Sequence, residues 1–211
     1  MMTLTRKKTT HAKLNPNFFQ TDNVQKIAKD LLGKVIVTCF DGKVTSGVIV
    51  ETEAYEGHTD KASHAYENKR TERTEVMYQD GGVAYIYLIY GLHQMFNVVT
   101  GGKDTPHAVL IRAVEPIDGL EFMLQRRKKL RAEYTLTRGP GAVAEAFGLG
   151  LNHNGSSVCS ELIWIEDRGT KIPEANVTAG PRIGVEYAEE HSELPYRFYI
   201  KGNNWVSKPN K

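Results

Sequence analysis

The sequence predicts an α+β fold, a single mixed domain around a curved antiparallel β-sheet with flanking helices and a protruding β-hairpin. Several segments rich in β-branched and aromatic residues follow one another with only turns between them. Regular helices do not separate these segments, which disfavours a doubly wound parallel sheet. With 211 residues the chain can bury one good core, so one domain is expected over residues 16–208.

The amino-terminal part begins with a predicted helix and two strands. Thr21 and Asp22 can cap a segment whose apolar residues follow helical spacing, and Gly33 is placed to end it. Residues 35–40 and 44–55 are rich in β-formers and flank an Asp-Gly turn. They therefore predict a β-hairpin.

A second hairpin is predicted in the middle of the chain. Residues 83–90 and 95–100 form its two strands, and Gly91 marks an irregular tip. The remaining elements are a strand over 108–114, a basic helix over 116–131, a helix over 140–149 that opens with Pro140, and short strands over 162–166, 183–185 and 196–201.

The charge of the chain is nearly balanced. Lys and Arg number 27 against 25 Asp and Glu, which gives a net charge of +2. This falls short of the strongly basic profile of many nucleic-acid binders, so any affinity for DNA must come from local clusters. One cluster contains Lys69, Arg70 and Arg73, and another spans residues 126–131. For the second cluster a solvated surface and a DNA contact both stay open.

The composition indicates a protein of a reducing compartment. Cys39 and Cys159 lack paired spacing, so neither a disulfide framework nor a cysteine-based zinc site is expected. Residues 1–15 are expected to form a mobile leader, and their basic residues are not followed by the apolar run of a secretory signal. No stretch has the apolar length of a membrane span, so we expect a cytoplasmic protein without membrane contact.

The strand over residues 48–55 carries the first candidate chemistry. Side chains alternate along a strand, which places Glu51, Glu53 and Tyr55 on one face and an apolar set on the other. A carboxylate beside the long polar stretch 56–79 can act as a general base. The alternative interpretation is an outward-facing pair that makes surface salt bridges.

The polar stretch 56–79 offers two interpretations of its histidines. His58, Asp60 and His64 could bind a metal with help from Glu53, as in a metal-dependent hydrolase. Neither a cysteine nor a further histidine lies at ligand spacing, so no metal is expected. His64 can instead form an aromatic wall against a flat base.

The tyrosines of the predicted hairpin are the most informative feature. Tyr85 and Tyr87 share a face, and for Tyr85 both a core position and a pocket position stay open. Tyr90 adjoins the tip, where a large side chain gains little from burial but could act as a wedge between base pairs. Asn97 and Arg112 interrupt apolar strands, and together they suggest the polar floor of a pocket.

These motifs resemble the alkyladenine (3-methyladenine) DNA glycosylase family over nearly the whole chain beyond the leader. The matching segments are Leu31-Leu-Gly-Lys, Val50-Glu-Thr-Glu-Ala-Tyr, Tyr85-Ile-Tyr-Leu-Ile-Tyr-Gly, Asn97-Val-Val, Leu110-Ile-Arg-Ala-Val-Glu-Pro, Arg138-Gly-Pro-Gly, Pro181-Arg-Ile-Gly, Tyr196-Arg-Phe-Tyr-Ile and Trp205-Val-Ser. The combination of the Glu-Thr-Glu-Ala-Tyr strand with the Tyr-Gly hairpin is specific to this family.

The resemblance implies a role for each candidate residue. Glu53 is the general base that activates water, and Arg112 is its partner in the water network. Asn97 screens substituents on the purine, and Tyr90 intercalates into the DNA. The aromatic walls of the base pocket are Tyr55, His64 and Tyr87. The candidate contacts to the DNA backbone are Arg70, Arg73, Arg138 and Gly139.

The resemblance also implies an activity. The implied activity is that of a monofunctional DNA glycosylase, which flips alkylated or deaminated purines out of duplex DNA through the minor groove and hydrolyses the N-glycosidic bond. The candidate lesions are 3-methyladenine, 7-methylguanine, hypoxanthine and etheno-adenine. Neither a cofactor, a metal nor a catalytic lysine is implied, and a monomer is expected. The alternative from another class is a non-catalytic reader of damaged or distorted nucleic acid.

Two places depart from the family pattern. Arg138 stands where a small polar residue is usual, and Ala142 where a lysine is frequent. Upstream of the hairpin, Arg73-Thr74 replaces an Arg-Asn pair. These differences bear on DNA contacts, while the implied catalytic set is intact.

Overall fold

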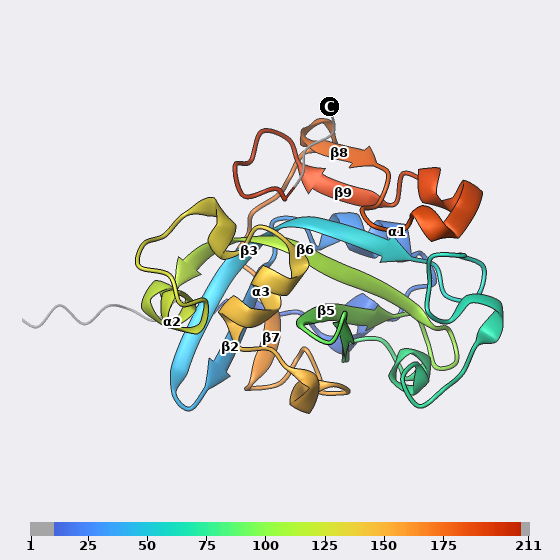
Figure 1. Ribbon diagram of the computed structural model, residues 1–211, viewed down its shortest axis with the longest axis horizontal. Helices are drawn as coiled ribbons and strands as arrows, with labels where there is room; N and C mark the ends of the chain where they lie inside the picture. Colours follow the sequence, from blue (N-terminus) through green and yellow to red (C-terminus); the bar gives the residue numbers. More distant parts are fainter. Residues whose placement is uncertain (1–10, 208–211) are drawn as a thin grey trace, which may run out of the picture.

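Nine strands form one sheet in the computed structural model, which describes residues 11–207 (Figure 1). The strands are β1 (Ala12–Lys13), β2 (Val35–Phe40), β3 (Lys43–Tyr55), β4 (Ala84–Ile89), β5 (His93–Thr100), β6 (His107–Asp118), β7 (Ile163–Asp167), β8 (Val177–Gly180) and β9 (Arg197–Ile200). Their order is β1-β7-β2-β3-β6-β5-β4, with β9 between β3 and β8, and the paired strands run antiparallel. Together with the helices described below, this confirms the predicted α+β class.

The long strand β3 organises the sheet. Along one edge it pairs with β6, and along the other edge it pairs first with β2 and then, at Glu51–Glu53, with β9. Gly47 allows the close approach to β6, because a Cβ there would lie 2.4 Å from a methyl carbon of Val114. The strand continues to Tyr55, so its second half carries the candidate residues into the middle of the sheet.

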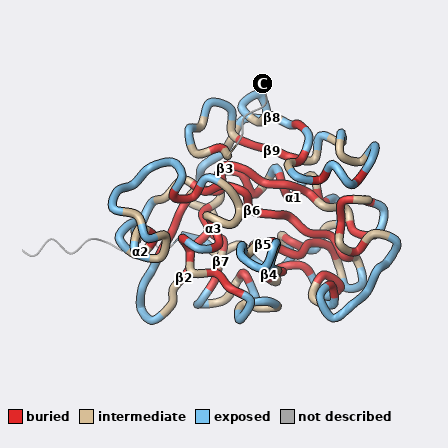
Figure 2. The backbone as a smooth tube through the Cα atoms, viewed as in Figure 1, coloured by how far each residue is buried: buried red, intermediate tan, exposed pale blue. Residues whose placement is uncertain are grey.

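Three α-helices pack against this sheet: α1 (Val24–Asp30), α2 (Leu120–Arg126) and α3 (Pro140–Phe147). In the view of Figure 1, α3 lies in front of the sheet and α1 behind it. Helix α1 contacts β3, β6 and β9, and α3 contacts β5 and β6. The buried core therefore contains side chains from the helices and from the strands between them (Figure 2).

The cap of α1 differs from the prediction. The side chain of Asn23, rather than Thr21 or Asp22, accepts a hydrogen bond from the backbone N–H of Lys26 at 2.8 Å. Asparagine is as good an N-cap as aspartate or serine, so three adjacent capping residues made the local signal ambiguous.

Two other elements also differ from the prediction. The helix expected over 116–131 is limited to α2, because β6 extends to Asp118, which pairs with Ser46 of β3. The strand expected over 183–185 does not form, and β8 lies upstream of it. Pro181 has no N–H for a strand ladder, and the N–H of Ile183 donates to Glu53 instead.

The two ends of the described chain bear on other expectations. Residues 1–10 of the expected leader lie outside the described residues, whereas Ala12–Lys13 pair with β7, so the sheet begins before residue 16. Across residues 11–207, no helix is both long enough and apolar enough to cross a bilayer.

The hairpin β4–β5 ends in an exposed tight turn. Tyr90 and Gly91 both have positive φ, at 53° and 66°, and the N–H of Leu92 donates to the carbonyl of Ile89 at 3.1 Å. Tyr90 is 87% exposed and Leu92 is 78% exposed. The tip therefore presents two large apolar side chains to solvent.

Candidate active site

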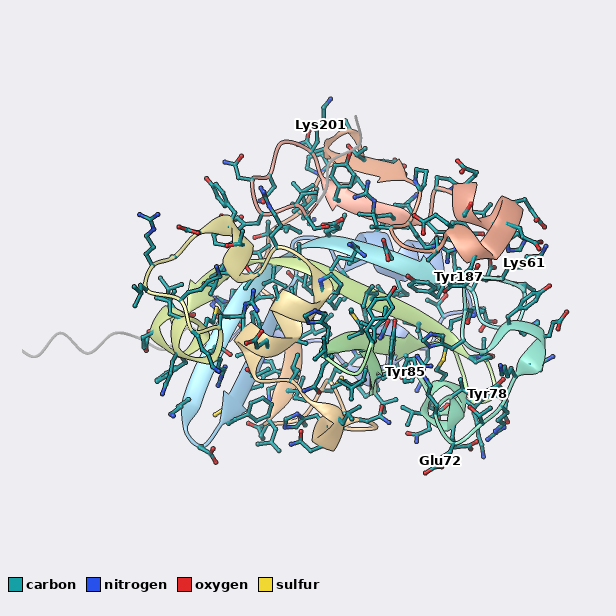
Figure 3. All side chains as sticks on the ribbon, in the orientation of Figure 1. Lys61, Glu72, Tyr78, Tyr85, Tyr187 and Lys201 are labelled. Atoms are coloured by element: carbon teal, nitrogen blue, oxygen red, sulfur yellow. The ribbon has the colours of Figure 1, made fainter. Side chains whose placement is uncertain are left out.

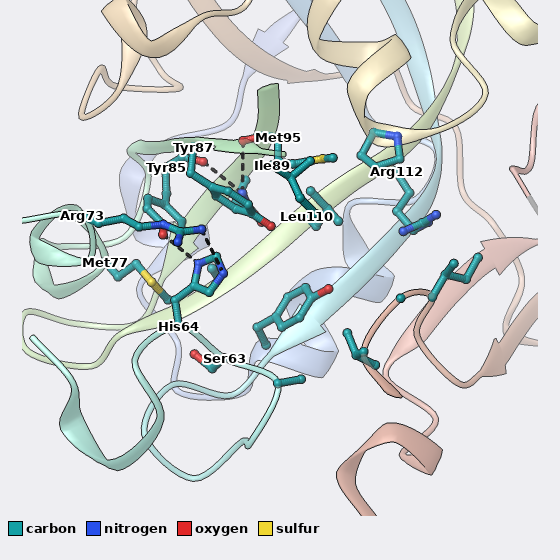
Figure 4. A pocket seen from close by; sticks show the side chains of 18 of the residues that line it. Ser63, His64, Arg73, Met77, Tyr85, Tyr87, Ile89, Met95, Leu110 and Arg112 are labelled. Atoms are coloured by element: carbon teal, nitrogen blue, oxygen red, sulfur yellow. Dashed lines mark hydrogen bonds between the residues drawn. The ribbon is translucent and has the colours of Figure 1, made fainter. Parts of the chain in front are cut away.

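A pocket of about 360 Å³ opens beside the second half of β3 (Figure 4). Strands β3, β4, β5 and β6 contribute to it, together with the segments 62–64 and 183–187. The sequence-predicted residues that line it are Tyr55, His64, Arg73, Tyr87, Tyr90, Asn97 and Arg112. Residues up to 57 positions apart in the sequence thus lie around one cavity, as the resemblance implies.

Aromatic rings form one side of this pocket. The rings of His64 and Tyr87 meet edge to face, with centroids 4.6 Å apart and an interplanar angle of 77°. Tyr85 lies 5.4 Å from Tyr87 and is almost fully buried behind it. Its hydroxyl lies 2.9 Å from Nδ1 of His64. Both interpretations of Tyr85 hold, because it belongs to a buried cluster and also lines the pocket.

The hydrogen bonds of His64 define its charge state. Nη2 of Arg73 lies 3.2 Å from Nε2 of His64, and a guanidinium can only donate, so Nε2 accepts. The remaining proton is then on Nδ1, which donates to the Tyr85 hydroxyl. Burial, followed by the charges of Arg73 and Lys69, lowers the pKa of His64 to about 4. His64 is therefore a neutral wall at pH 7.

Glu53 lies directly behind the pocket lining. Its side chain is fully buried, so the interpretation of residues 51 and 53 as an outward-facing surface pair is wrong. Oε1 accepts a hydrogen bond from the N–H of Ile183, and Oε2 accepts one from the Tyr55 hydroxyl, both at 2.9 Å. Arg112 Nη1 is 3.3 Å from Oε1. These three covering groups belong to pocket-lining residues, so the carboxylate directly contacts residues that line the cavity.

Tyr55 links the aromatic wall to this carboxylate. Burial and the negative charge of Glu53 raise the pKa of its hydroxyl well above the usual value, so the group remains a protonated donor. Because the same side chain lines the pocket, a base that stacks on Tyr55 would lie within one side-chain length of Glu53.

Arg112 bridges the two buried carboxylates of β3. Its Nε is 3.4 Å from Glu51 Oε1, in addition to the contact with Glu53. Burial alone would lower the pKa of Arg112. The negative charges of Glu53 and then of Glu51 outweigh this effect, so the pKa of Arg112 is raised. Glu51 also accepts hydrogen bonds from Arg197 and from the backbone N–H of Ser207. The guanidinium groups of Arg112 and Arg197 therefore balance the charges of the two carboxylates, which both remain buried.

A buried ion pair that sequence reasoning missed supports Tyr55 from behind. Arg182 binds Asp60 with both terminal nitrogens, with Nη2 at 2.9 Å from Oδ1, and it also donates to the carbonyl of Ala54. Its guanidinium carbon lies 4.8 Å from the Tyr55 ring centroid and 5.3 Å from that of Tyr196. Arg182 occurs in the Pro181-Arg-Ile-Gly motif, but only the tertiary structure shows its partner.

This ion pair also bears on the metal-site alternative. Asp60 is occupied by Arg182, and His64 is directed to Tyr85 and Arg73. Over residues 11–207, no group of three or more His, Cys, Asp or Glu side chains is arranged to hold a metal ion. The combination of His58, Asp60 and His64, which the sequence offered as an alternative, is therefore not brought together in the described residues.

The candidate DNA-backbone residues lie around the pocket in different settings. Arg70 pairs with Glu75 at 2.6 Å and with Asp104 at 2.9 Å, outside the pocket. Arg138 packs on the ring of Tyr134 and donates to the carbonyl of Asn204. Gly139 caps α3, and the next residue, Pro140, lines the pocket. Arg73 is itself a lining residue.

Two further features of the site were not evident from sequence. Both amide hydrogens of Asn97 have backbone acceptors, the carbonyls of Tyr85 and Met95.

Tyr187 extends the pocket rim from the carboxy-terminal segment, on the side of the molecule where Lys61 lies (Figure 3). Its hydroxyl donates to the carbonyl of Ala62 at 3.1 Å. No periodic pattern precedes Tyr187 that could have identified it.

Part of the basic cluster over 126–131 is used inside the fold. Arg126 donates to the carbonyl of Ala146 at 2.9 Å, and Arg127 pairs with Glu145. Arg131 pairs with Glu133 at the surface. Local packing therefore accounts for Arg126 and Arg127, whereas for the exposed residues of the cluster a solvated surface and a DNA contact both stay open.

Most of the chain is similar to proteins of one known family. Residues 17–204 match the methylpurine-DNA glycosylase (MPG) family. A Chlamydia felis protein named "Putative 3-methyladenine DNA glycosylase" is 50% identical over 188 residues, which cover 89% of this chain and 95% of that protein. Proteins of the same name from Chlamydia abortus and Bacillus thuringiensis are 47% and 46% identical, with 90% and 92% of this chain covered and 100% and 98% of theirs.

The fold and the match define a DNA-repair glycosylase, an enzyme class that acts on the N-glycosidic bond. The chain belongs to the methylpurine-DNA glycosylase family. The resemblance drawn from the sequence motifs is thereby confirmed.

Proposed function

We propose that this protein is a monofunctional, purine-specific DNA N-glycosylase that flips alkylated or deaminated purines out of duplex DNA and hydrolyses their glycosidic bond. The observation that carries the proposal is the contact between an aromatic wall and a buried carboxylate, the 2.9 Å hydrogen bond from Tyr55 to Glu53. It brings a stacking surface for a base and a candidate general base to the same place.

The roles follow the geometry of the pocket. The damaged base stacks among Tyr55, His64 and Tyr87, which line one cavity. Bond cleavage builds positive charge on the sugar, so an anionic Glu53 behind this wall stabilises it and activates the attacking water. Arg112 holds the carboxylate in place through its contact at 3.3 Å.

The burial of Glu53 sets a requirement for this mechanism. Its two oxygens are covered by Ile183, Tyr55 and Arg112, so water must displace at least one of these groups. The Tyr55 hydroxyl is the simplest to displace, because a rotation about the Cα–Cβ bond (χ1) swings the whole ring and its hydroxyl away without breaking the sheet. We propose that stacking of the flipped base produces this rotation.

Tyr90 is proposed to enter the minor groove and fill the space that the flipped base leaves. Its 87% exposure at a hairpin tip fits a wedge, and the pocket opens beside it. Among the described residues, the pocket lining contains no lysine, so we propose hydrolysis without a Schiff base and without strand cleavage. We also propose that the protein acts as a monomer.

The test uses Glu53→Gln, which keeps the size of the side chain and one acceptor oxygen but removes the negative charge. The variant is expected to bind lesion-containing duplex like the parent protein and to lose base release by about 100-fold or more in single turnover. Base release at the parental rate would show that Glu53 is not the general base. A gel assay after the reaction, with and without alkali, tests for strand cleavage.

A non-catalytic reader of damaged DNA is the second candidate, and the complete burial of Glu53 is the observation that favours it. Such a reader would bind the lesion duplex through the same pocket and wedge. It would release no base, even from the parent protein over prolonged incubation. The parental reaction therefore separates the two functions.

A further inference from the structure

The pocket lining contains two guanidinium groups that differ in their charge partners. Arg112 contacts both Glu51 and Glu53, so its charge is neutralised from behind. Arg73 makes no ion pair with any carboxylate among residues 11–207. Within the same described residues, no aspartate or glutamate lines the pocket. Arg73 therefore adds an uncompensated positive charge to the place where a base would stack.

Arg73 lies directly against the aromatic walls (Figure 4). Its guanidinium carbon is 4.8 Å from the ring centroid of Tyr87, within the range of a cation–π contact. Its Nη2 lies 3.2 Å from Nε2 of His64. Two of the three predicted wall residues thus contact this guanidinium, which has no carboxylate partner, whereas the third, Tyr55, lies against Arg182, whose charge is paired with Asp60.

We propose that Arg73 is a specificity-determining residue that weakens the recognition of cationic purines and favours neutral purines that carry hydrogen-bond acceptors. Cationic purines are those alkylated on a ring nitrogen, such as 7-methylguanine, and hypoxanthine is a neutral purine. This inference rests on the proposed function and names the substrate class of the same site.

The electrostatic argument has two parts. The negative face of an aromatic ring attracts a cationic base, but the guanidinium already lies over the ring of Tyr87 and uses part of this attraction. A second positive charge in the same pocket is also repelled by Arg73, and because the Arg73 side chain is exposed, solvent and salt screen part of this repulsion. Both effects act only on the charged lesion.

The hydrogen-bonding argument favours a neutral base. A guanidinium has five N–H donors, and one of those of Arg73 is used by His64. The remaining donors can bind a carbonyl oxygen or an unalkylated ring nitrogen of a purine. Alkylation of that nitrogen removes the acceptor, so the same lesion loses a hydrogen bond and meets a like charge.

The experiment compares single-turnover base release from two duplexes of identical sequence, one with hypoxanthine and one with 7-methylguanine at the same position. Spontaneous loss of 7-methylguanine is subtracted with a reaction that lacks protein. Arg73→Gln removes the charge but keeps an N–H donor, and Arg73→Lys keeps the charge. Melting temperatures show whether each variant folds.

Arg73→Gln is expected to raise the ratio of 7-methylguanine to hypoxanthine release by about 5-fold, the effect of one cation–π contact. Arg73→Lys is expected to keep the ratio close to the parental value. Arg70→Gln is the matched control, because Arg70 lies on the same segment but pairs with Glu75 and Asp104. It is expected to keep the parental ratio, since contacts to DNA phosphates carry no information about the base.

An unchanged ratio in Arg73→Gln, or a shift toward hypoxanthine, would overturn this inference while the proposed function stands. If the parent protein releases neither base, the proposed function fails, and the affinities for the two duplexes become the readout. The same 5-fold shift in relative affinity is then expected for Arg73→Gln. Equal affinity ratios in the variant and the parent would reject the role of Arg73 in that case too.

Discussion

The buried pair of Asp60 and Arg182 provides the most quantitative test of how the site is held together. We consider the substitution Arg182→Met, which keeps most of the side-chain volume but removes the guanidinium. Both residues are almost fully buried, and the pair joins the segment that supplies Ile183 to the loop after β3. Removal of one partner leaves an uncompensated buried charge on Asp60, which costs about 3–5 kcal/mol.

This cost translates into a large change of melting temperature. For a domain of this size, 1 kcal/mol corresponds to about 2–4 °C, so Arg182→Met is expected to melt about 6–20 °C below the parent protein. Thermal unfolding followed by circular dichroism measures this. The double variant Asp60→Asn with Arg182→Met is expected to lose less than the sum of the two single changes, because the partners interact directly.

A neighbouring ion pair supplies the control. Lys61 joins the same two segments through Glu189 and Glu190, but these pairs lie at the surface. Lys61→Met is therefore expected to melt near the parental temperature. If Arg182→Met also melts within about 1 °C of the parent, the argument from desolvation is wrong for this site.

Two further predictions concern the walls and the wedge. The pKa of His64 is lowered from 6.5 to about 4 in the folded protein, so the unfolded state binds more protons between these values. The stability that neutral His64 provides is complete above pH 6.5 and is lost as pH falls toward 4. Between pH 7 and pH 5 the parent is expected to lose about 2 kcal/mol more than His64→Phe in urea unfolding, and parallel losses would contradict this assignment. Tyr90→Ala is expected to weaken binding to lesion duplex by about tenfold or more with little change in melting temperature, because the side chain is 87% exposed. A large drop in melting temperature with parental affinity would show that Tyr90 is structural.

Local patterns predicted the framework of the fold. The Asp-Gly turn and the β-formers on both sides predicted the hairpin β2–β3, and the tyrosine-rich segment predicted β4. These signals are local, because a turn and its two strands lie within about 20 residues. The ends of elements were less accurate, since pairing of Asp118 with Ser46 extends β6 beyond Pro116.

Several of the predicted site residues lie around one pocket, but the burial of Glu53 was not predicted. Motif resemblance brought Tyr55, His64 and Tyr87 to one pocket, and the structure places them there. Strand alternation suggested that the face with Glu53 is open, but the segment around Ile183 covers it. Such covering comes from residues about 130 positions away, which alternation within one strand cannot reveal.

The turn at the tip of β4–β5 places a bulky side chain in a backbone conformation that such residues rarely adopt. Two successive turn residues with positive φ are most readily Asn-Gly, because asparagine tolerates a positive φ better than a bulky side chain does. Here the first of the two places is held by Tyr90 at φ 53°. The chain thus adopts a positive φ that is unfavourable for a tyrosine, and this turn presents a flat aromatic ring to solvent at the end of the hairpin.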